Sequence, residues 1–149
     1  MSATPSFGTQ VIGQTEKALG AILGELLHGT GLSEPHWVTL TLTAVSAGEA
    51  DRDELVHRVA GALRVSDAQA SALISELAAK HLVNVPDSAA SPVTLTDAGQ
   101  NLHATIRAAV SQITERLWGD LPAEDLAVAG RVLSTVAARA NEELAGGVR

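Results

Sequence analysis

Two helix-start signals fifteen residues apart constrain the fold of this chain more than any other feature. Asp51 is followed three residues later by Glu54, and Ser66 is followed by Gln69 at the same interval. This is the spacing of the N-cap and N3 residues in a capping box. Apolar residues recur at helical spacing after each signal, which predicts two short helices. The inward-facing residues are expected to be Leu55, Val59 and Leu63 in the first helix and Ala70, Leu73, Ile74 and Leu77 in the second. Because two residues, 64–65, separate these helices, the pair predicts a helix-turn-helix.

A β-hairpin is predicted directly after the second short helix. Residues 82–85 and 92–96 are rich in Val, Leu and Thr, and they flank a loop at 86–91 with Pro, Asp and Ser. A hairpin in this position is a candidate wing beside the helix-turn-helix.

Longer helices are predicted on both sides of this region. Apolar residues at helical spacing indicate one helix at Val11–His28 and another from about residue 97 to Gly119. A last helix starts with the acidic pair Glu124 and Asp125 and carries a near-heptad apolar repeat to Leu144. Such a repeat needs a partner that covers it.

Residues 38–45 leave two structures open. They alternate at period two and are rich in Val and Thr, which favours a strand. Ser33 as an N-cap, Pro35 in the first turn and apolar residues at helical spacing from Trp37 favour a helix. The residues alone do not decide between them.

Composition supports a helical fold and excludes several function classes. The 149 residues are 46% hydrophobic but only 2% aromatic, so a core of Leu, Val, Ile and Ala between closely spaced helices is expected. The absence of cysteine excludes disulfides, thiolate zinc sites, iron–sulfur clusters and thiol switches. Without a long apolar run or a charged-then-apolar leader, we expect neither a membrane span nor a signal peptide, and the cytoplasm is the expected location.

Catalysis has little support in the sequence. There is no Gly-x-Ser-x-Gly elbow, no phosphate-binding glycine loop and no His-Glu-x-x-His helix. Asp51 and Glu54 are better explained as helix capping. We therefore expect a protein that is not an enzyme and has no cofactor.

The order of these elements resembles the multiple-antibiotic-resistance regulator (MarR) family of bacterial transcription factors over about residues 10–145. Three segments carry the resemblance: Glu76–Val83 at the end of the second short helix, the Leu-Thr-x-x-Gly pattern of Leu95–Gly99, and Leu121–Leu126 at the entry to the last helix. The resemblance implies a mainly α fold with a small β-hairpin wing, in which Trp37 lies on a helix.

The resemblance also implies a domain organisation and partners. Residues 1–149 form a single chain, with a helical dimerisation region at 10–30 and 97–145 and a winged helix-turn-helix at 34–96. Two copies form a homodimer that presents two helix-turn-helix units to successive major grooves of double-stranded DNA. A small aromatic or phenolic effector releases such regulators from DNA.

The second short helix is the candidate recognition helix. Gln69 is its best base reader, because an amide side chain can make a bidentate contact with adenine, and Ser71 and Ser75 could bond to bases or phosphates. The alternative is that Gln69 only caps the helix and the serines face water. Arginine and lysine would contact phosphates. The candidate DNA contacts are Arg52, Arg58, Arg64, Ser66, Asp67, Gln69, Ser71, Ser75 and Lys80.

The charge of the chain opposes DNA binding. The net charge is −7, and residues 46–97 hold four Arg or Lys against eight Asp or Glu, a net −4. A uniformly acidic surface repels a duplex. No Lys or Arg lies between Lys80 and Arg107, so the hairpin lacks the arginines typical of the family's wing, and Arg64 and His81 stand where the family has glycine. The alternative function is therefore a dimer of the same type with weak or lost DNA binding, which binds a ligand or another protein.

Five residues are candidates for binding an effector. They are His28, His36, Trp37, His103 and Arg107. Trp37 could stack on a ring and Arg107 could pair with a carboxylate. The alternative places Trp37 in the core, Arg107 in an ion pair and the histidines in water. A zinc site from the histidines and Glu34 is not expected, because Arg107 occupies the i+4 position after His103 where a second ligand is needed.

Overall fold

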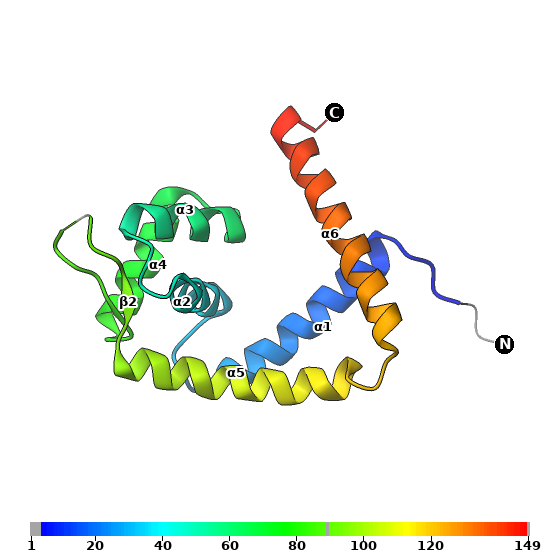
Figure 1. Ribbon diagram of the computed structural model, residues 1–149, viewed down its shortest axis with the longest axis horizontal. Helices are drawn as coiled ribbons and strands as arrows, with labels where there is room; N and C mark the ends of the chain where they lie inside the picture. Colours follow the sequence, from blue (N-terminus) through cyan, green and yellow to red (C-terminus); the bar gives the residue numbers. More distant parts are fainter. Residues whose placement is uncertain (1–3, 89, 149) are drawn as a thin grey trace. The chain divides into compact units, whose positions relative to one another are not determined.

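The computed structural model describes residues 4–88 and 90–148 and is mainly helical with one small hairpin (Figure 1). The elements are α1 (Thr9–Leu27), α2 (Glu34–Ser46), α3 (Arg52–Leu63), α4 (Asp67–Ala79), β1 (Val83–Asn84), β2 (Thr94–Leu95), α5 (Asp97–Trp118) and α6 (Ala123–Gly146). The predicted fold class, mainly α with a β-hairpin wing, is confirmed. Ala89, at the tip of the predicted loop, lies outside the described residues.

The chain forms two compact units that meet within α5. The first runs to Val110 and holds α1 to α4, the hairpin and the first half of α5. In it, α2, α3 and α4 pack against one another beside the hairpin (Figure 1). The second begins at Ser111 and holds the rest of α5 and α6. The dimerisation region expected at 10–30 and 97–145 depends on a second copy and stays a prediction.

The core of the first unit lies between the helix-turn-helix, α2 and the hairpin. Leu55 and Val59 of α3 and Ile74 and Leu77 of α4, which the sequence placed on the inward faces, are at most 1% exposed. The other buried apolar residues are Leu27, Leu32, Leu40, Ala50, Ala70, Leu82, Val83, Val93 and Ile106. The helix-turn-helix is thus held by ordinary burial of aliphatic side chains.

The alternating stretch at 38–45 forms a helix, which decides between the two structures that the residues left open. Ser33 caps α2 and exchanges hydrogen bonds with His36, and Pro35 occupies the first turn. Thr39 and Thr43 are buried, and their hydroxyls donate to the carbonyls of Pro35 and Thr39 at 2.8 Å. Because each hydroxyl bonds one turn back along its own helix, β-branched residues are accommodated there.

The hairpin is shorter than predicted and is joined by a segment that the sequence did not reveal. β1 and β2 pair antiparallel, with Val83 opposite Leu95. Just before β2 in the sequence, Pro92 forms a bridge with Asp51, and Val93 N–H donates to the Ala50 carbonyl at 3.0 Å. The connection between α2 and α3 is therefore bonded to the loop side of the hairpin.

The start of α5 packs closely against the junction between α4 and β1. Thr96 donates its hydroxyl to the His81 carbonyl at 2.7 Å and its backbone N–H to the Leu82 carbonyl at 3.0 Å. The same hydroxyl accepts from Gly99 N–H at 3.0 Å and so caps α5. Gly99 is buried, and a Cβ added there would overlap the Leu82 carbonyl oxygen. This contact explains why the Leu-Thr-x-x-Gly pattern requires both Thr and Gly.

Replacing Gly99 by alanine is expected to destabilise the protein. The added methyl forces α5 away from Leu82 and strains the two hydrogen bonds of Thr96. We expect Gly99→Ala to lower the free energy of unfolding by about 1–3 kcal/mol, the usual cost of overpacking. Urea unfolding at one fixed protein concentration measures it.

Gly61→Ala is the matched control for this substitution. Gly61 lies inside α3, and a Cβ there meets nothing within 4 Å. This variant should gain about 0.5–1 kcal/mol from helix propensity. If Gly99→Ala is as stable as Gly61→Ala, the close contact with Leu82 is wrong.

Candidate nucleic-acid interface

The turn between α3 and α4 and the cap of α4 are both built from side chains that the sequence singled out. Arg64 ends α3 in the left-handed conformation, with φ 56°. Ser66 Oγ accepts from Gln69 N–H at 3.1 Å, and Ser66 N–H donates to Gln69 Oε1 at 3.0 Å, which completes the predicted capping box. The box at α3 is half formed, since Asp51 accepts from Glu54 N–H at 2.9 Å.

Gln69 is both a capping residue and an exposed one. Its carbonyl oxygen is used by the capping box, which leaves the amide N–H groups at the surface of the first turn of α4. Those donors can serve a base acceptor, whereas the oxygen already has a partner. The two interpretations from the sequence, cap or base reader, are therefore compatible in one side chain.

Arg52, Ser71 and Ser75 are brought together by the packing of α3 against α4. Arg52 Nη2 donates to Ser71 Oγ and to Ser75 Oγ, both at 3.1 Å. Ser71 and Ser75 are one turn apart, so they share a face of α4. The sequence identified all three residues as candidate DNA contacts, but it did not predict that they bond to one another. The only signal was the four-residue spacing of the serines, which places them on one face of a helix.

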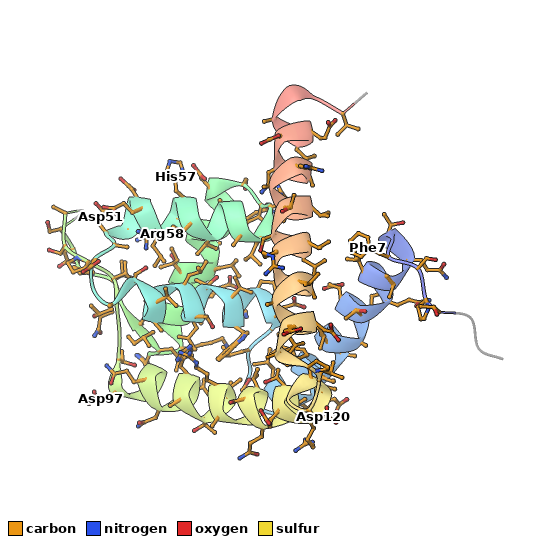
Figure 2. The ribbon with its side chains drawn as sticks, turned by 45° about the vertical axis from the view of Figure 1, so that its right-hand side comes forward. Phe7, Asp51, His57, Arg58, Asp97 and Asp120 are labelled. Atoms are coloured by element: carbon orange, nitrogen blue, oxygen red, sulfur yellow. The ribbon has the colours of Figure 1, made fainter. Side chains whose placement is uncertain are left out.

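The other three basic residues of the helix-turn-helix region, Arg58, Arg64 and Lys80, lie at three different positions. Arg58 donates to Ser46 Oγ of α2 at 2.9 Å, and Figure 2 shows it on the side of α3 opposite His57. Lys80 caps the end of α4, with its ammonium 3.6 Å from where a Cβ on Gly31 would lie. Arg64 lies in the turn between α3 and α4. Arg52, Arg58 and Lys80 thus lie against three different elements: α4, α2 and the loop after α1.

Carboxylates surround the start of both helices. Asp53 and Glu54 lie in the first turn of α3, and Asp67 lies in the first turn of α4. These carboxylates stabilise the two helices, because the N-terminal end of a helix dipole is positive. His57 Nδ1 is 3.7 Å from Asp67 Oδ1, but both side chains are largely exposed, so the pair contributes little to stability.

Two of the candidate effector residues form a stacked aromatic pair, in which His103 is buried and Trp37 is partly buried. Trp37 of α2 and His103 of α5 have ring centroids 5.1 Å apart and planes at 24°. His103 is 8% exposed, and its Nε2 has no hydrogen-bond partner within the described chain. Burial lowers the pKa of His103, and the nearby positive charge of Arg107 lowers it further. The imidazole is therefore neutral at pH 7.

The three remaining candidates are not part of this stack. His36 bonds through Nδ1 to Ser33 N–H at 3.2 Å, and its Nε2 is 3.7 Å from Glu76 Oε1 on α4. Glu76, which the sequence did not single out, thus faces α2 from the recognition helix. His28 is exposed at the end of α1, and Arg107 is exposed one turn after His103. Among residues 4–88 and 90–148, no three His, Asp or Glu side chains are placed to hold a metal ion.

No helix in the described parts of the chain is long and apolar enough to cross a membrane.

Comparison with known proteins identifies the fold. No family model and no curated protein matches the sequence. Solved structures do match. CouR from Rhodococcus jostii RHA1, bound to p-coumaroyl-CoA, is 19% identical over 85% of this chain and 89% of its own, with a TM-score of 0.71. The MarR-family protein Rv2887 of Mycobacterium tuberculosis, in complex with salicylic acid, is 22% identical over 85% and 94%, with a TM-score of 0.58.

Escherichia coli MarR in its apo form is a third match, 19% identical over 91% of this chain and 98% of its own, with a TM-score of 0.62. These three structures share one architecture and cover nearly the full length of both chains. The protein therefore has the winged helix-turn-helix fold of the MarR-family regulators, as the sequence resemblance implied.

Stability is expected to fall in acid because of His103. Its pKa is near 6.5 when the chain is unfolded and lower when it is folded. As the pH falls below about 6.5, the unfolded state takes up a proton before the folded state does, so the free energy of unfolding decreases. In urea unfolding, the free energy of unfolding of His103→Gln should decrease less between pH 8 and pH 5 than that of the parent protein.

His28→Gln is the matched control, because His28 is exposed. This variant should keep the pH dependence of the parent protein. If acid lowers the free energy of unfolding equally in the parent and in His103→Gln, the role of His103 is contradicted.

Proposed function

We propose that the protein is a dimeric winged helix-turn-helix regulator of transcription, which binds double-stranded DNA and is released by a small aromatic effector. The observation that carries the proposal is the capped recognition helix α4, which exposes Gln69 within a fold shared with three MarR-family structures. In this proposal the protein acts in the cytoplasm and by binding rather than by catalysis.

DNA contact is proposed through the exposed first turns of α4. The N-terminal part of a recognition helix enters the major groove, while the preceding helix crosses the phosphate backbone. Gln69 would read a base through its free amide N–H groups, and Ser66 and Asp67 border it at the helix start. Arg52 and Arg64 would serve phosphates. Arg58 and Lys80, which face α2 and the loop after α1, are less suited to that role.

Dimer formation is proposed through α6. Its apolar side chains are exposed along the whole helix. They are Leu126, Val128, Val132, Leu133, Val136 and Leu144. A run of this length marks an interaction surface. The near-heptad repeat fits another helix, and a second copy supplies one, with α1 and α5 completing the dimerisation region at 10–30 and 97–145.

Effector binding is proposed beside the Trp37 and His103 stack. Trp37 offers an aromatic face, His103 Nε2 lacks a partner within the described residues, and Arg107 adds a cation one turn along α5. This combination suits an aromatic molecule with a carboxylate or carbonyl group. CouR and Rv2887 carry p-coumaroyl-CoA and salicylic acid in the compared structures.

A charged residue in the middle of α6 should break the dimer. Leu133 is 46% exposed in one copy and would be buried by a partner. The substitution occurs twice in the dimer, and each copy loses about 1 kcal/mol of apolar burial, so Leu133→Lys should weaken dimerisation about 30-fold through lost burial alone. The charge placed in the interface adds to this loss. Sedimentation velocity should then show a monomer at micromolar concentration.

Val45→Lys is the control for this experiment. Val45 is an even more exposed apolar residue, at 69%, but it lies on α2. It should leave the dimer intact. If Leu133→Lys sediments as the parent protein does, α6 is not the dimer interface.

Gln69→Glu should change DNA recognition without removing the helix cap. Glutamate keeps the acceptor that Ser66 N–H requires, but it loses the amide donors that reach a base. Fluorescence anisotropy with a fragment upstream of the protein's own gene should show the parent binding below micromolar concentration at physiological salt. Gln69→Glu should lose about 1–3 kcal/mol of DNA-binding free energy, and it should lose the preference for one base at one position of the site.

Gln100→Glu introduces the same charge on an exposed position of α5 and serves as the control. It should bind as the parent does. Salicylate or p-coumaroyl-CoA added to the preformed complex should lower the anisotropy if an effector of this class releases DNA. If the parent binds no DNA even at low salt, the regulator is rejected and a ligand- or protein-binding dimer becomes the explanation.

A further inference from the structure

Arg52 is held against the recognition helix by two neutral groups. Both donors of Nη2 are used, one by Ser71 Oγ and one by Ser75 Oγ, at 3.1 Å each. Arginine has five N–H donors, so those of Nε and Nη1 are not used by the two serines. Because its two partners are hydroxyls and not carboxylates, Arg52 is oriented without losing its charge.

The acids nearest to Arg52 in the sequence do not neutralise it. Asp51 uses Oδ1 to accept from Glu54 N–H, and neither of these residues nor Asp53 forms an ion pair with Arg52 in the described chain. Arg58 of the same helix is different, since it donates to a hydroxyl of α2, Ser46, that is itself buried. Arg52 is thus the cation of α3 that lies against the recognition helix.

The two serines hold the guanidinium from the second helix. Ser71 and Ser75 lie one turn apart on α4, and their hydroxyl oxygens accept from Nη2 of Arg52. The N–H groups of Nε and Nη1 are left as a set of donors whose position is fixed by two helices. An oxyanion with several acceptor oxygens fits such a set, and a phosphate has this chemistry.

We propose that Arg52, Ser71 and Ser75 form a clamp for one backbone phosphate of DNA, in which Arg52 makes the contact and the two serines are positioning residues. The inference rests on the proposed DNA-binding function. A phosphate is favoured over a base, because Arg52 lies on the first helix of the helix-turn-helix, which crosses the backbone. The clamp gives the acidic segment a cation whose orientation is set before binding, which reduces the entropy lost in the complex.

The salt dependence of binding tests the clamp. Each phosphate contact adds about 0.9 to the slope of log affinity against log salt, so Arg52→Gln should lower the slope of the dimer by about 1.8. Since a phosphate carries no sequence information, the variant should weaken binding to the specific fragment and to a scrambled fragment by the same factor. Arg58→Gln, on the same helix, should leave the slope unchanged.

The serines are tested by a double-mutant cycle. Ser71→Ala with Ser75→Ala should weaken binding to both fragments, and the same changes should cause no further loss when Arg52 is already Gln. A serine pair with a purely structural role would lower the free energy of unfolding and would not alter the salt slope. Serine effects that persist in the Arg52→Gln background overturn the positioning role.

The outcomes separate the clamp from the proposed function. A parent protein that binds no DNA at low salt rejects both. A parent that binds while Arg52→Gln keeps its salt slope, or loses affinity only for the specific fragment, overturns the phosphate clamp and retains the regulator. An equal slope change in Arg58→Gln would mean that overall charge, and not the geometry around Arg52, controls binding.

Discussion

The close approach of α5 to the end of α4 is the contact on which the first unit depends. Gly99 lets the helix touch the Leu82 carbonyl, and Thr96 bonds to His81 and Leu82 on one side and caps α5 on the other. Three elements therefore meet at one point: the end of α4, the start of β1 and the start of α5. The start of α5 is joined directly to the end of α4 and the start of β1 by hydrogen bonds.

A second link between the same helices runs through α2. Trp37 stacks on His103 of α5, and the adjacent His36 faces Glu76 of α4 across 3.7 Å. A molecule that separates Trp37 from His103 would act on a helix in contact with the recognition helix. This arrangement joins the proposed effector site to α4, the helix proposed to contact DNA.

The sequence predicted the regular parts of this structure because their signals are local. Ser66 and Gln69 were recognised as a cap, and Leu55, Val59, Ile74 and Leu77 as inward-facing residues, from spacing alone. The helix at 34–46 required more information, since its threonines also suit a strand. What decides it is that Thr39 and Thr43 are buried with their hydroxyls bonded to carbonyls one turn back, which depends on tertiary packing.

Contacts between distant residues could not be predicted in the same way. The bond from Val93 to Ala50 and the bonds from Arg52 to the two serines join segments whose approach is set by the whole fold. The net charge of −4 over residues 46–97 likewise follows from the composition, but it does not predict where the Arg and Lys side chains lie. Arg64 and His81 both adopt positive φ, at 56° and 62°, a conformation that favours glycine and that no spacing in the sequence predicted.

The most direct test of the account is a hydroxyl-radical footprint of the purified protein on DNA from upstream of its own gene. A dimer that inserts two copies of α4 into successive major grooves should protect two patches related by two-fold symmetry, about 10 base pairs apart from centre to centre. That pattern would support the helix-turn-helix, the dimer and the DNA contact together. Uniform cleavage at a concentration where the protein is a folded dimer would contradict the central claim that this fold binds DNA.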